Sequence, residues 1–456
     1  MLRELILAGV NVFRLNFSHG THDDHGAVIA NVRKLEAELG IHVGVLQDLP
    51  GPKVRTGAFG EGISSIQLRE GDGFTLVSYE FPGTQEKVSV GYAGLPRDVE
   101  VGKRLYLADG AIALRIVKTS ESEIRTTVEV GGELRATQGI NYPDGTLGIS
   151  AVTDKDLEHL AFGLQAGVDW IGVSFVKSAA DIMRVKTFIA ERSRRKIPVI
   201  AKIEKHEALE NIDEIVEVSD GIMVARGDLG IEIPLEEVPL VQKDLIARCN
   251  RASKPVITAT QMLESMITSP RPTRAEATDV ANAILDGTDA VMLSGETARG
   301  AYPVEAVTVM ATIAREVEAR YPHDAMRDRR LANEPPAIET SIAEAAARTT
   351  ESLGLGVIVC GTTTGNTARH ISSFRPSART IALTPIVDVA RQISLFWGVD
   401  AMVVPPYTYI ETLIDIAEQR MIEEGLAKAG DYIAITSGMP VGEGGTNVLK
   451  LHQIRD

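Results

Sequence analysis

The sequence predicts an α/β protein in which a parallel sheet is covered by helices. Short apolar runs recur in the middle of the chain, each run ends abruptly in polar residues, and a helix-like segment follows each of them. From Trp170 onwards the runs are spaced by ~20–35 residues, the size of one strand-plus-helix unit. Strands that are apolar almost throughout are typical of sheets buried on both faces, which are parallel sheets.

We assign six of these runs to strands, and they cover residues 43–48, 170–175, 198–204, 221–226, 255–260 and 289–294. Helical signals lie between them. Thr273 and Glu276 have the spacing of a capping box, which predicts a helix that begins just before the apolar residues 280–284.

The composition changes twice along the chain. Residues 52–149 are rich in Gly, Val and Thr in alternating polar and apolar order, which predicts a small all-β domain inserted in a loop. A charged, proline-containing stretch, 321–336, is interpreted as a linker, and the α/β pattern resumes at Ser341. We therefore expect a catalytic domain of residues 1–51 and 150–325, a β lid domain of residues 52–149, and a C-terminal α/β domain of residues 337–456.

Composition excludes several classes of protein. The chain has 456 residues, 44% of them hydrophobic, enough for several cores. A net charge of −15 argues against nucleic acid or an anionic membrane as the main partner. Two cysteines, Cys249 and Cys360, cannot form a disulfide framework, and no apolar run approaches the roughly 18 residues of a membrane helix. We see no secretory signal and expect a cytoplasmic location.

Polar residues gather at the ends of the predicted strands, and in a βα barrel these ends meet on one face. Lys202 and Glu204 are two residues apart, as are Arg226 and Asp228, so each pair is expected to share a strand face. Two carboxylates suit Mg²⁺, and Lys202 would supply positive charge where a phosphoryl group transfers. A structural ion-pair cluster is the alternative, because such networks resemble active sites.

Several other polar groups are ambiguous when each is taken alone. Arg14, Asn16 and Ser18 are expected to share a face, and Arg14 suits phosphate binding. Thr260 could bind a carboxylate or relay a proton, although threonine is also common in strands. Ser174 is similarly open to two interpretations.

A threonine-rich loop follows the predicted strand 356–360 in the C-terminal domain and opens a helix. Such a loop can bind an anion, and an ordinary helix cap is the alternative; its residues are Thr362, Thr363, Thr364, Gly365, Asn366 and Thr367. The chain contains no GxxxxGK[ST], which excludes a P-loop kinase, and no GxGxxG after a strand, which argues against a dinucleotide oxidoreductase.

Taken together, these residues closely resemble the pyruvate kinase family over essentially the whole chain. The resemblance is carried by residues 11–20, 47–52, 202–204, 219–234, 254–266, 270–276 and 292–298. It implies a (β/α)₈ TIM barrel with a β lid inserted after the third strand and a C-terminal effector domain. Because the chain starts within the family's first helix, the first barrel strand is expected to be missing.

The resemblance also implies a reaction: transfer of the phosphoryl group of phosphoenolpyruvate to ADP, giving ATP and pyruvate, as the last step of glycolysis. It implies that Glu204 and Asp228 hold Mg²⁺ or Mn²⁺ and that Lys202 stabilises the transferring group. Gly227, Asp228 and Thr260 would receive the substrate carboxylate, and Thr260 would help to deliver the proton. Arg14 would bind phosphate, and Ser174 would lie in the same cleft.

The monovalent-cation site of the family is similar to Asn16, Ser18 and Asp48 of this chain. Leu49, Pro50 and Lys53 depart from the common pattern and resemble the potassium-independent branch, in which a lysine replaces K⁺. We therefore expect that K⁺ is not required.

The lid and the regulatory region carry further differences from the family. Gln138 stands where the family's lid usually has a lysine, and Met439 stands where sugar-bisphosphate-regulated relatives often have an aromatic residue. A phosphate-bearing allosteric effector and a homotetramer are expected from the resemblance. A catalytically impaired, N-terminally truncated homologue that only binds effectors, and a metal-dependent aldolase with the same barrel, are the alternatives.

Overall fold

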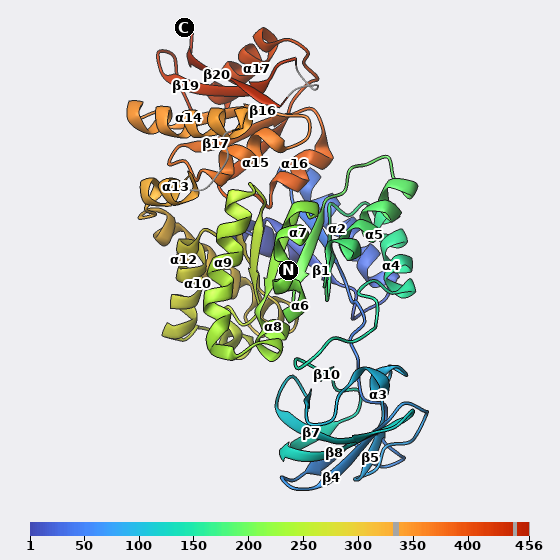
Figure 1. The fold of residues 1–456 in the computed structure, drawn as a ribbon. Helices are drawn as coiled ribbons and strands as arrows, with labels where there is room; N and C mark the ends of the chain where they lie inside the picture. The colour runs from blue at the N-terminus through green and yellow to red at the C-terminus, as the bar shows by residue number, and fades with distance from the viewer. Residues whose placement is uncertain (332–336, 441–444, 456) are drawn as a thin grey trace.

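The computed structural model describes residues 1–331, 337–440 and 445–455 and consists of three parts (Figure 1). An α/β body lies in the middle, an all-β lid hangs from one end of it, and a second α/β domain packs on the opposite end. The predicted architecture, a barrel domain with an inserted β lid and a C-terminal α/β domain, is confirmed.

The central sheet has seven parallel strands in the order β1-β2-β11-β12-β13-β14-β15. In the described residues β1 and β15 are its two edges, and no ladder joins them. The strands are β1 (Val12–Asn16), β2 (Gly44–Leu49), β11 (Trp170–Val173), β12 (Val199–Ile203), β13 (Gly221–Ala225), β14 (Val256–Ala259) and β15 (Ala290–Val291). Five of the six predicted runs contain one of these strands, and the run 43–48 covers β2 except for its last residue, Leu49.

Helices cover this sheet and place its side chains. They are α1 (Leu2–Ala8), α2 (His22–Leu39), α4 (Asp154–Ala166), α5 (Ala179–Arg192), α6 (His206–Glu210), α7 (Ile212–Val218), α8 (Arg226–Glu232), α9 (Val238–Arg251), α10 (Arg274–Asp286), α11 (Gly295–Ala298), α12 (Pro303–Glu318) and α13 (His323–Leu331), with the short 3₁₀ turns η1 (Leu235–Glu237) and η2 (Glu264–Ile267).

Two predictions about these helices have different outcomes. The capping box of Thr273 and Glu276 is confirmed at the start of α10. The stretch 321–336, which we interpreted as a linker, is helical over most of its described part, because α13 occupies 323–331. Residues 332–336 lie outside the described part of the chain.

The lid lies between β2 and α4 and contains a six-stranded sheet, in the order β10-β6-β7-β8-β4-β5, and a two-stranded sheet. Its elements are β3 (Ser65–Leu68), β4 (Gly73–Val77), β5 (Lys87–Ser89), α3 (Leu95–Asp98), β6 (Arg104–Leu107), β7 (Ile112–Thr119), β8 (Glu123–Val130), β9 (Gly132–Arg135) and β10 (Ile140–Asn141). Leu76, Leu105 and Leu114 are fully buried between these strands, so the lid has a core of its own.

The C-terminal domain is built on five strands in the order β18-β17-β16-β19-β20, of which only β20 is antiparallel. Its elements are α14 (Ile338–Leu353), β16 (Val357–Gly361), α15 (Asn366–Ser373), β17 (Arg379–Thr384), α16 (Val387–Ile393), β18 (Val399–Val403), α17 (Ile410–Glu423), β19 (Tyr432–Gly438) and β20 (Thr446–Gln453). Arg375 fastens this domain to the barrel, because its guanidinium donates to Asp289 Oδ1 at 2.8 Å and to the carbonyl oxygen of Gly287 at 2.6 Å.

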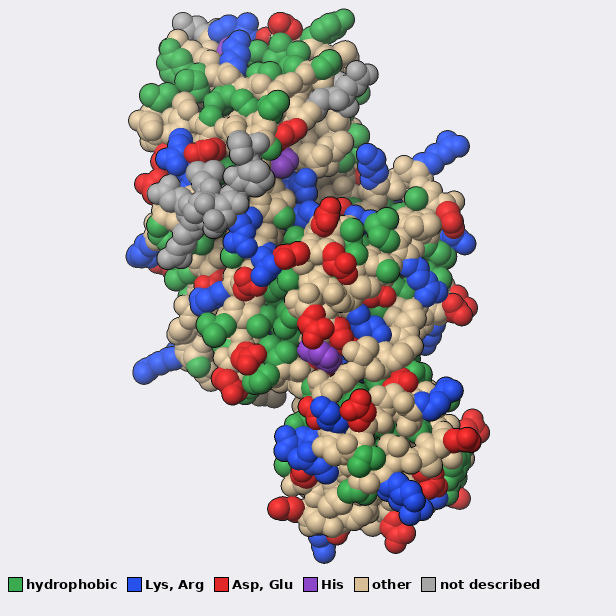
Figure 2. Space-filling model, in the orientation of Figure 1, with side chains coloured by type: hydrophobic (Ala, Val, Ile, Leu, Met, Phe, Trp, Pro, Cys, Tyr) green, Lys and Arg blue, Asp and Glu red, His purple; other side chains and the backbone are tan. Residues whose placement is uncertain are grey.

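The surface mixes both signs of charge over all three parts, and the lid joins the barrel through a narrow neck (Figure 2). Within the described residues, no helix is long and apolar enough to span a membrane. Cys249 and Cys360 are both buried and free.

Candidate active site

The Lys202 ammonium lies at the centre of a buried polar network at the carboxyl ends of three neighbouring strands, β2, β11 and β12. Its Nζ donates to Ser174 Oγ at 2.6 Å and forms ion pairs with Asp48 Oδ1 at 3.0 Å and Glu204 Oε1 at 2.9 Å. The Lys202 side chain is only 8% exposed. The structure therefore brings together four residues that the sequence placed at the ends of separate strands.

The charges of this network determine its protonation. Burial alone would lower the pKa of Lys202, but Asp48 and Glu204 outweigh burial and raise it. Burial would raise the pKa of Asp48, yet Lys202 and Arg14 hold it below its ordinary value. Both groups therefore remain charged at neutral pH.

Glu204 behaves differently from Asp48. Burial raises the pKa of Glu204, and the nearby carboxylates of Asp228 and Asp48 add to this effect, although Lys202 opposes it. Its Oε2 also accepts a hydrogen bond from the Phe175 amide at 2.8 Å. The negative charge around Glu204 is thus only partly balanced by the protein, and a bound cation would relieve it.

Arg14 joins the network from β1, where its Nε donates to Asp48 Oδ2 at 2.6 Å. Asn16 lies opposite Asp48 in the β1–β2 register, and its Oδ1 accepts a hydrogen bond from the Ser18 amide at 3.1 Å. The expectation that Ser18 shares the strand face is wrong, because β1 ends at Asn16 and Ser18 lies in the following turn, where it is exposed.

The first turn of α8 carries Gly227 and Asp228. Arg226 was expected to share a strand face with Asp228, but β13 ends at Ala225 and both residues belong to the helix. Positions two apart on a helix point about 200° apart. Arg226 accordingly turns to the carbonyl oxygen of Thr260, at 2.6 Å, whereas Asp228 turns to Lys53.

Thr260 approaches Gly227 closely, just beyond the end of β14. A Cβ atom at Gly227 would lie 2.8 Å from Thr260 Cγ2, closer than side chains tolerate. Thr260 itself has φ of 77° and Gln261 has φ of 56°, both in the left-handed region that residues with a Cβ rarely adopt. The backbone of the α8 turn and the Thr260 side chain therefore adjoin one another.

Lys53 connects the lid to the barrel. Its Nζ lies 3.1 Å from Asp228 Oδ1 and 3.5 Å from Asp109 Oδ1 in the lid. Burial would lower the pKa of Lys53, but Asp228 and Asp109 raise it. The cations that contact Asp48 are Lys202 and Arg14, so the structure places the Lys53 ammonium on Asp228.

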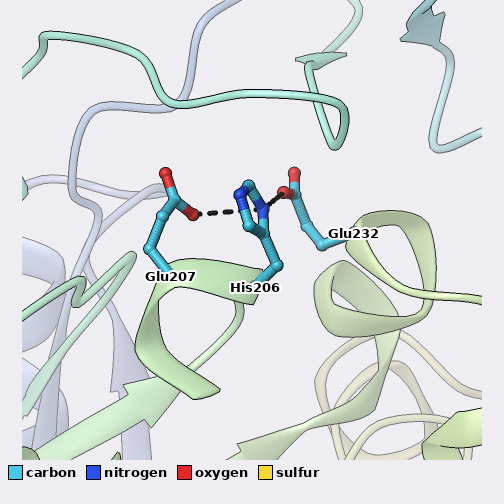
Figure 3. Close-up of side chains that lie close together, drawn as sticks. All are labelled: His206, Glu207 and Glu232. Carbon is cyan, nitrogen blue, oxygen red and sulfur yellow. Dashed lines mark hydrogen bonds and ion pairs between the residues drawn. The ribbon is translucent and has the colours of Figure 1, made fainter. Parts of the chain in front are cut away.

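A second acidic group lies next to this site and was not noticed in the sequence. His206 Nδ1 lies between Glu207 Oε2, at 3.2 Å, and Glu232 Oε2, at 3.3 Å (Figure 3). These three side chains could hold a metal ion. However, Lys205 Nζ and Asn141 Nδ2 already contact Glu232 Oε1, at 2.8 and 2.9 Å.

Because Asn141 belongs to β10, the group around Glu232 ties the returning strand of the lid to the barrel. The hydrogen bond to Glu232 raises the pKa of His206, while burial opposes this. The only feature of the sequence that could have indicated this group is the polar run Lys205-His206-Glu207 directly after Glu204.

The threonine-rich loop lies between β16 and α15, as the sequence predicted. Thr362 Oγ1 accepts a hydrogen bond from the Gly365 amide at 2.9 Å, and Thr367 Oγ1 accepts from Thr446 Oγ1 at 2.8 Å. Thr364 and Asn366 are exposed at the start of the helix. Thr362 thus orders the loop, whose N-cap residue Gly365 offers no side-chain cap, and Thr364 and Asn366 face outward.

Comparison with known proteins shows which family has a similar sequence and fold. The model "Pyruvate kinase, barrel domain" matches residues 1–307, and "Pyruvate kinase, alpha/beta domain" matches residues 340–452. The pyruvate kinase of Geobacillus stearothermophilus is 46% identical over 100% of this chain and 78% of its own length, and pyruvate kinase 2 of Synechocystis sp. is 45% identical over 100% and 77%. A crystal structure of a pyruvate kinase from Cryptosporidium parvum superposes with a TM-score of 0.94 at 38% identity, over 99% of this chain and 92% of that one.

Proposed function

This chain belongs to the pyruvate kinase family, and from this premise we propose how its residues carry out the reaction. Its function is that of a pyruvate kinase, which transfers the phosphoryl group of phosphoenolpyruvate to ADP in glycolysis and gives ATP and pyruvate. The observation that carries this conclusion is the match of the full chain to curated relatives at 45–46% identity.

We propose that Lys202 stabilises the phosphoryl group in transfer. The support is its position: a buried ammonium, fixed by Ser174, Asp48 and Glu204, cannot turn away and needs no reorganisation when negative charge develops. Its raised pKa keeps it positive over the whole neutral range. Ser174 would orient this ammonium and border the substrate.

The family uses a divalent metal. We propose that Glu204 and Asp228 hold Mg²⁺ or Mn²⁺, since hard cations prefer carboxylate oxygens and the nearby Asp228 raises the pKa of Glu204. When bound, the metal would neutralise the oxygens of the two anionic substrates. The donor set therefore fits the ion.

The carboxylate of phosphoenolpyruvate would be received by the backbone N–H groups of Gly227 and Asp228 and by the Thr260 hydroxyl. The close approach of Thr260 to Gly227 supports this arrangement, because it leaves no room for a side chain between backbone and ligand. Thr260 would also help to deliver the proton to the enolate carbon. Arg14, held by Asp48, would bind the phosphate.

We propose that K⁺ is not required. Asn16, Ser18 and Asp48 correspond to the family's monovalent-cation ligands, and Lys53 is the substitute cation. The support is its direct ion pair with Asp228, which puts a fixed positive charge in the site. In this arrangement the ammonium would act through Asp228.

The proposal also covers an effector site, the oligomeric state and the division into domains. A phosphate-bearing effector would bind at the loop of residues 362–367, which opens α15. We further propose a homotetramer in the cytoplasm, with functional units of residues 1–51 and 150–325, 52–149, and 337–456.

The experiment that tests the function is an assay with phosphoenolpyruvate, ADP and MgCl₂ that follows ATP with luciferase and pyruvate with lactate dehydrogenase. We expect the two products to form in equal amounts. Effector binding without either product would indicate the impaired homologue instead. Carbon–carbon cleavage of a keto acid without ATP would indicate the aldolase.

A further inference from the structure

Arg369 of the C-terminal domain is a partly buried cation that forms no direct ion pair within the described part of the chain. It lies on α15, its Nε is buried, and this atom has no hydrogen-bond partner in the described residues. Burial lowers the pKa of its guanidinium, and only Asp220 opposes this effect. A guanidinium taken out of water without an anion is costly, so its presence needs a reason.

A second cation, Lys254 of the barrel, faces the same region. Its Nζ donates to three backbone carbonyl oxygens, those of Val216, Glu217 and Ser219, at 2.5, 2.6 and 2.7 Å. These bonds use all three of its hydrogens, so Lys254 can offer charge but no further hydrogen bond. Burial lowers its pKa to about 8; Asp220 opposes this effect, and repulsion from Arg369 and Lys186 adds to it.

A half-open pocket lies between these two cations, and its empty space of about 190 Å³ includes solvent at its mouth. Lys254 and Ser253 of the barrel line it from one side, and Arg369 and Ser372 of the C-terminal domain line it from the other.

The carboxylates near this pocket are already paired. Asp289 lines it, but its Oδ1 accepts from Arg375 at 2.8 Å and its Oδ2 from the Val256 amide at 2.9 Å. Asp220 pairs with Lys186 at 2.8 Å. Asp220 therefore acts on Arg369, Lys254 and Lys186 together, and this group carries more positive than negative charge.

We propose that this pocket binds an oxyanion of the phosphate class at the junction of the barrel and the C-terminal domain. The Arg369 guanidinium is the main ligand, since its planar set of donors matches phosphate, and Lys254 contributes charge. This place is separate from the loop of residues 362–367, yet both lie on α15. An anion held here fixes α15 to the barrel and thereby connects the effector loop to the catalytic domain.

The test measures thermal unfolding of the full chain in buffer free of phosphate and sulfate, with inorganic phosphate or NaCl added at equal ionic strength. Wild type is compared with Arg369→Met and with the control Arg379→Met, which removes an exposed arginine paired with Asp400 on the same domain. Without phosphate, Arg369→Met should unfold at the same or a higher temperature than wild type, because an unpaired charge is lost. With phosphate, wild type should gain stability that Arg369→Met lacks, while Arg379→Met should respond as wild type does.

Two outcomes would overturn the proposal. One is an equal response to phosphate in wild type and Arg369→Met, and the other is a lower unfolding temperature of Arg369→Met in both buffers, which would make Arg369 a structural residue.

Crystals soaked in tungstate give a second check, with an anomalous peak at Arg369 expected in wild type alone. Repeating the titration with glucose 6-phosphate and AMP separates the sources of the phosphate, since a larger Arg369-dependent response to either would indicate a phosphate monoester.

Discussion

Asn141, in the last strand of the lid, donates a hydrogen bond of 2.9 Å to Glu232 at the end of helix α8 of the barrel. Glu232 is buried, and Lys205 holds the same carboxylate oxygen at 2.8 Å. The lid is therefore anchored by a charged group in the helix whose first turn carries Gly227 and Asp228.

This anchor leads to a prediction for Asn141→Ala. A hydrogen bond to a charged group contributes about 1.5–3 kcal/mol, so we expect Asn141→Ala to weaken the attachment of the lid to the barrel by about this amount. Amide hydrogen exchange of residues 52–149 should become faster in the strands next to the two connections between the lid and the barrel. Gln67→Ala, at an exposed position of the lid, is the control, and an exchange pattern of Asn141→Ala equal to that of this control would contradict the prediction.

Two glycines of α8 form a matched pair. A Cβ at Gly227 would lie 2.8 Å from Thr260 Cγ2, whereas a Cβ at Gly230 would meet Leu235 Cδ1 at an ordinary 3.6 Å. We expect Gly227→Ala to lower kcat/KM for phosphoenolpyruvate by about 10²-fold, since a displaced positioning group can cost that much. Gly230→Ala should keep most of the wild-type value. Similar kinetics for the two variants would show that the Gly227–Thr260 approach does not matter.

Lys202→Met removes the centre of the buried network. We expect kcat to fall by about 10²–10³-fold or more, because a preorganised charge at the transferring group is lost. The variant should also be less stable by about 3–5 kcal/mol, since Asp48 and Glu204 lose their buried partner. Denaturant unfolding measures the second effect, and Lys155→Met, an exposed lysine on α4, is the control. Turnover equal to wild type would remove Lys202 from the mechanism.

Part of this site could be predicted from the sequence because it depends on local order. Continuous apolar runs identify buried parallel strands, and the residue that follows such a run must lie at the carboxyl edge of the sheet. Lys202, Glu204, Asp48 and Ser174 were located in this way, and the structure joins them through hydrogen bonds and ion pairs.

The features that the sequence did not reveal depend on contacts between distant segments. Strand β20 alternates polar and apolar residues too weakly to stand out, and only its antiparallel pairing with β19 identifies it. The contact of Lys53 with Asp228 spans 175 positions and requires the lid to be in place. Arg226 and Asp228 diverge because the chain turns from strand to helix at Ala225, a boundary that apolar periodicity does not locate.

The role of Lys53 can be tested through the monovalent cation. We expect wild-type turnover to be nearly the same in tetramethylammonium chloride and in KCl, because the Lys53 ammonium already supplies the positive charge at Asp228. Lys53→Glu should lose activity in tetramethylammonium chloride and recover part of it in KCl. A strong requirement of the wild type for K⁺ would refute the prediction.

The variant Glu204→Gln should be at least as stable as wild type without metal, although it loses a proposed metal ligand. The pKa of Glu204 is raised by burial and by Asp228, so the folded protein binds this proton more tightly than the unfolded chain does. Wild type therefore loses stability as pH rises above the ordinary value of 4.5 towards the raised pKa, and Gln, which cannot ionise, avoids that loss. Without metal at pH 8, Glu204→Gln should unfold at the same or a higher temperature than wild type, and this advantage should shrink as the pH approaches 4.5.

Added Mg²⁺ should reverse the order of the two proteins. A metal that binds only the folded state stabilises it by RT ln(1 + [Mg²⁺]/Kd), which is about 2.7 kcal/mol at a hundredfold excess over Kd. Wild type should gain this stability, whereas Glu204→Gln should gain little of it because one of the two carboxylates is gone. Glu305→Gln, an exposed change on α12, should behave as wild type at every pH and metal concentration. If Glu204→Gln responded fully to Mg²⁺, the metal would have to be held elsewhere, and the buried charge on Glu204 would need another explanation.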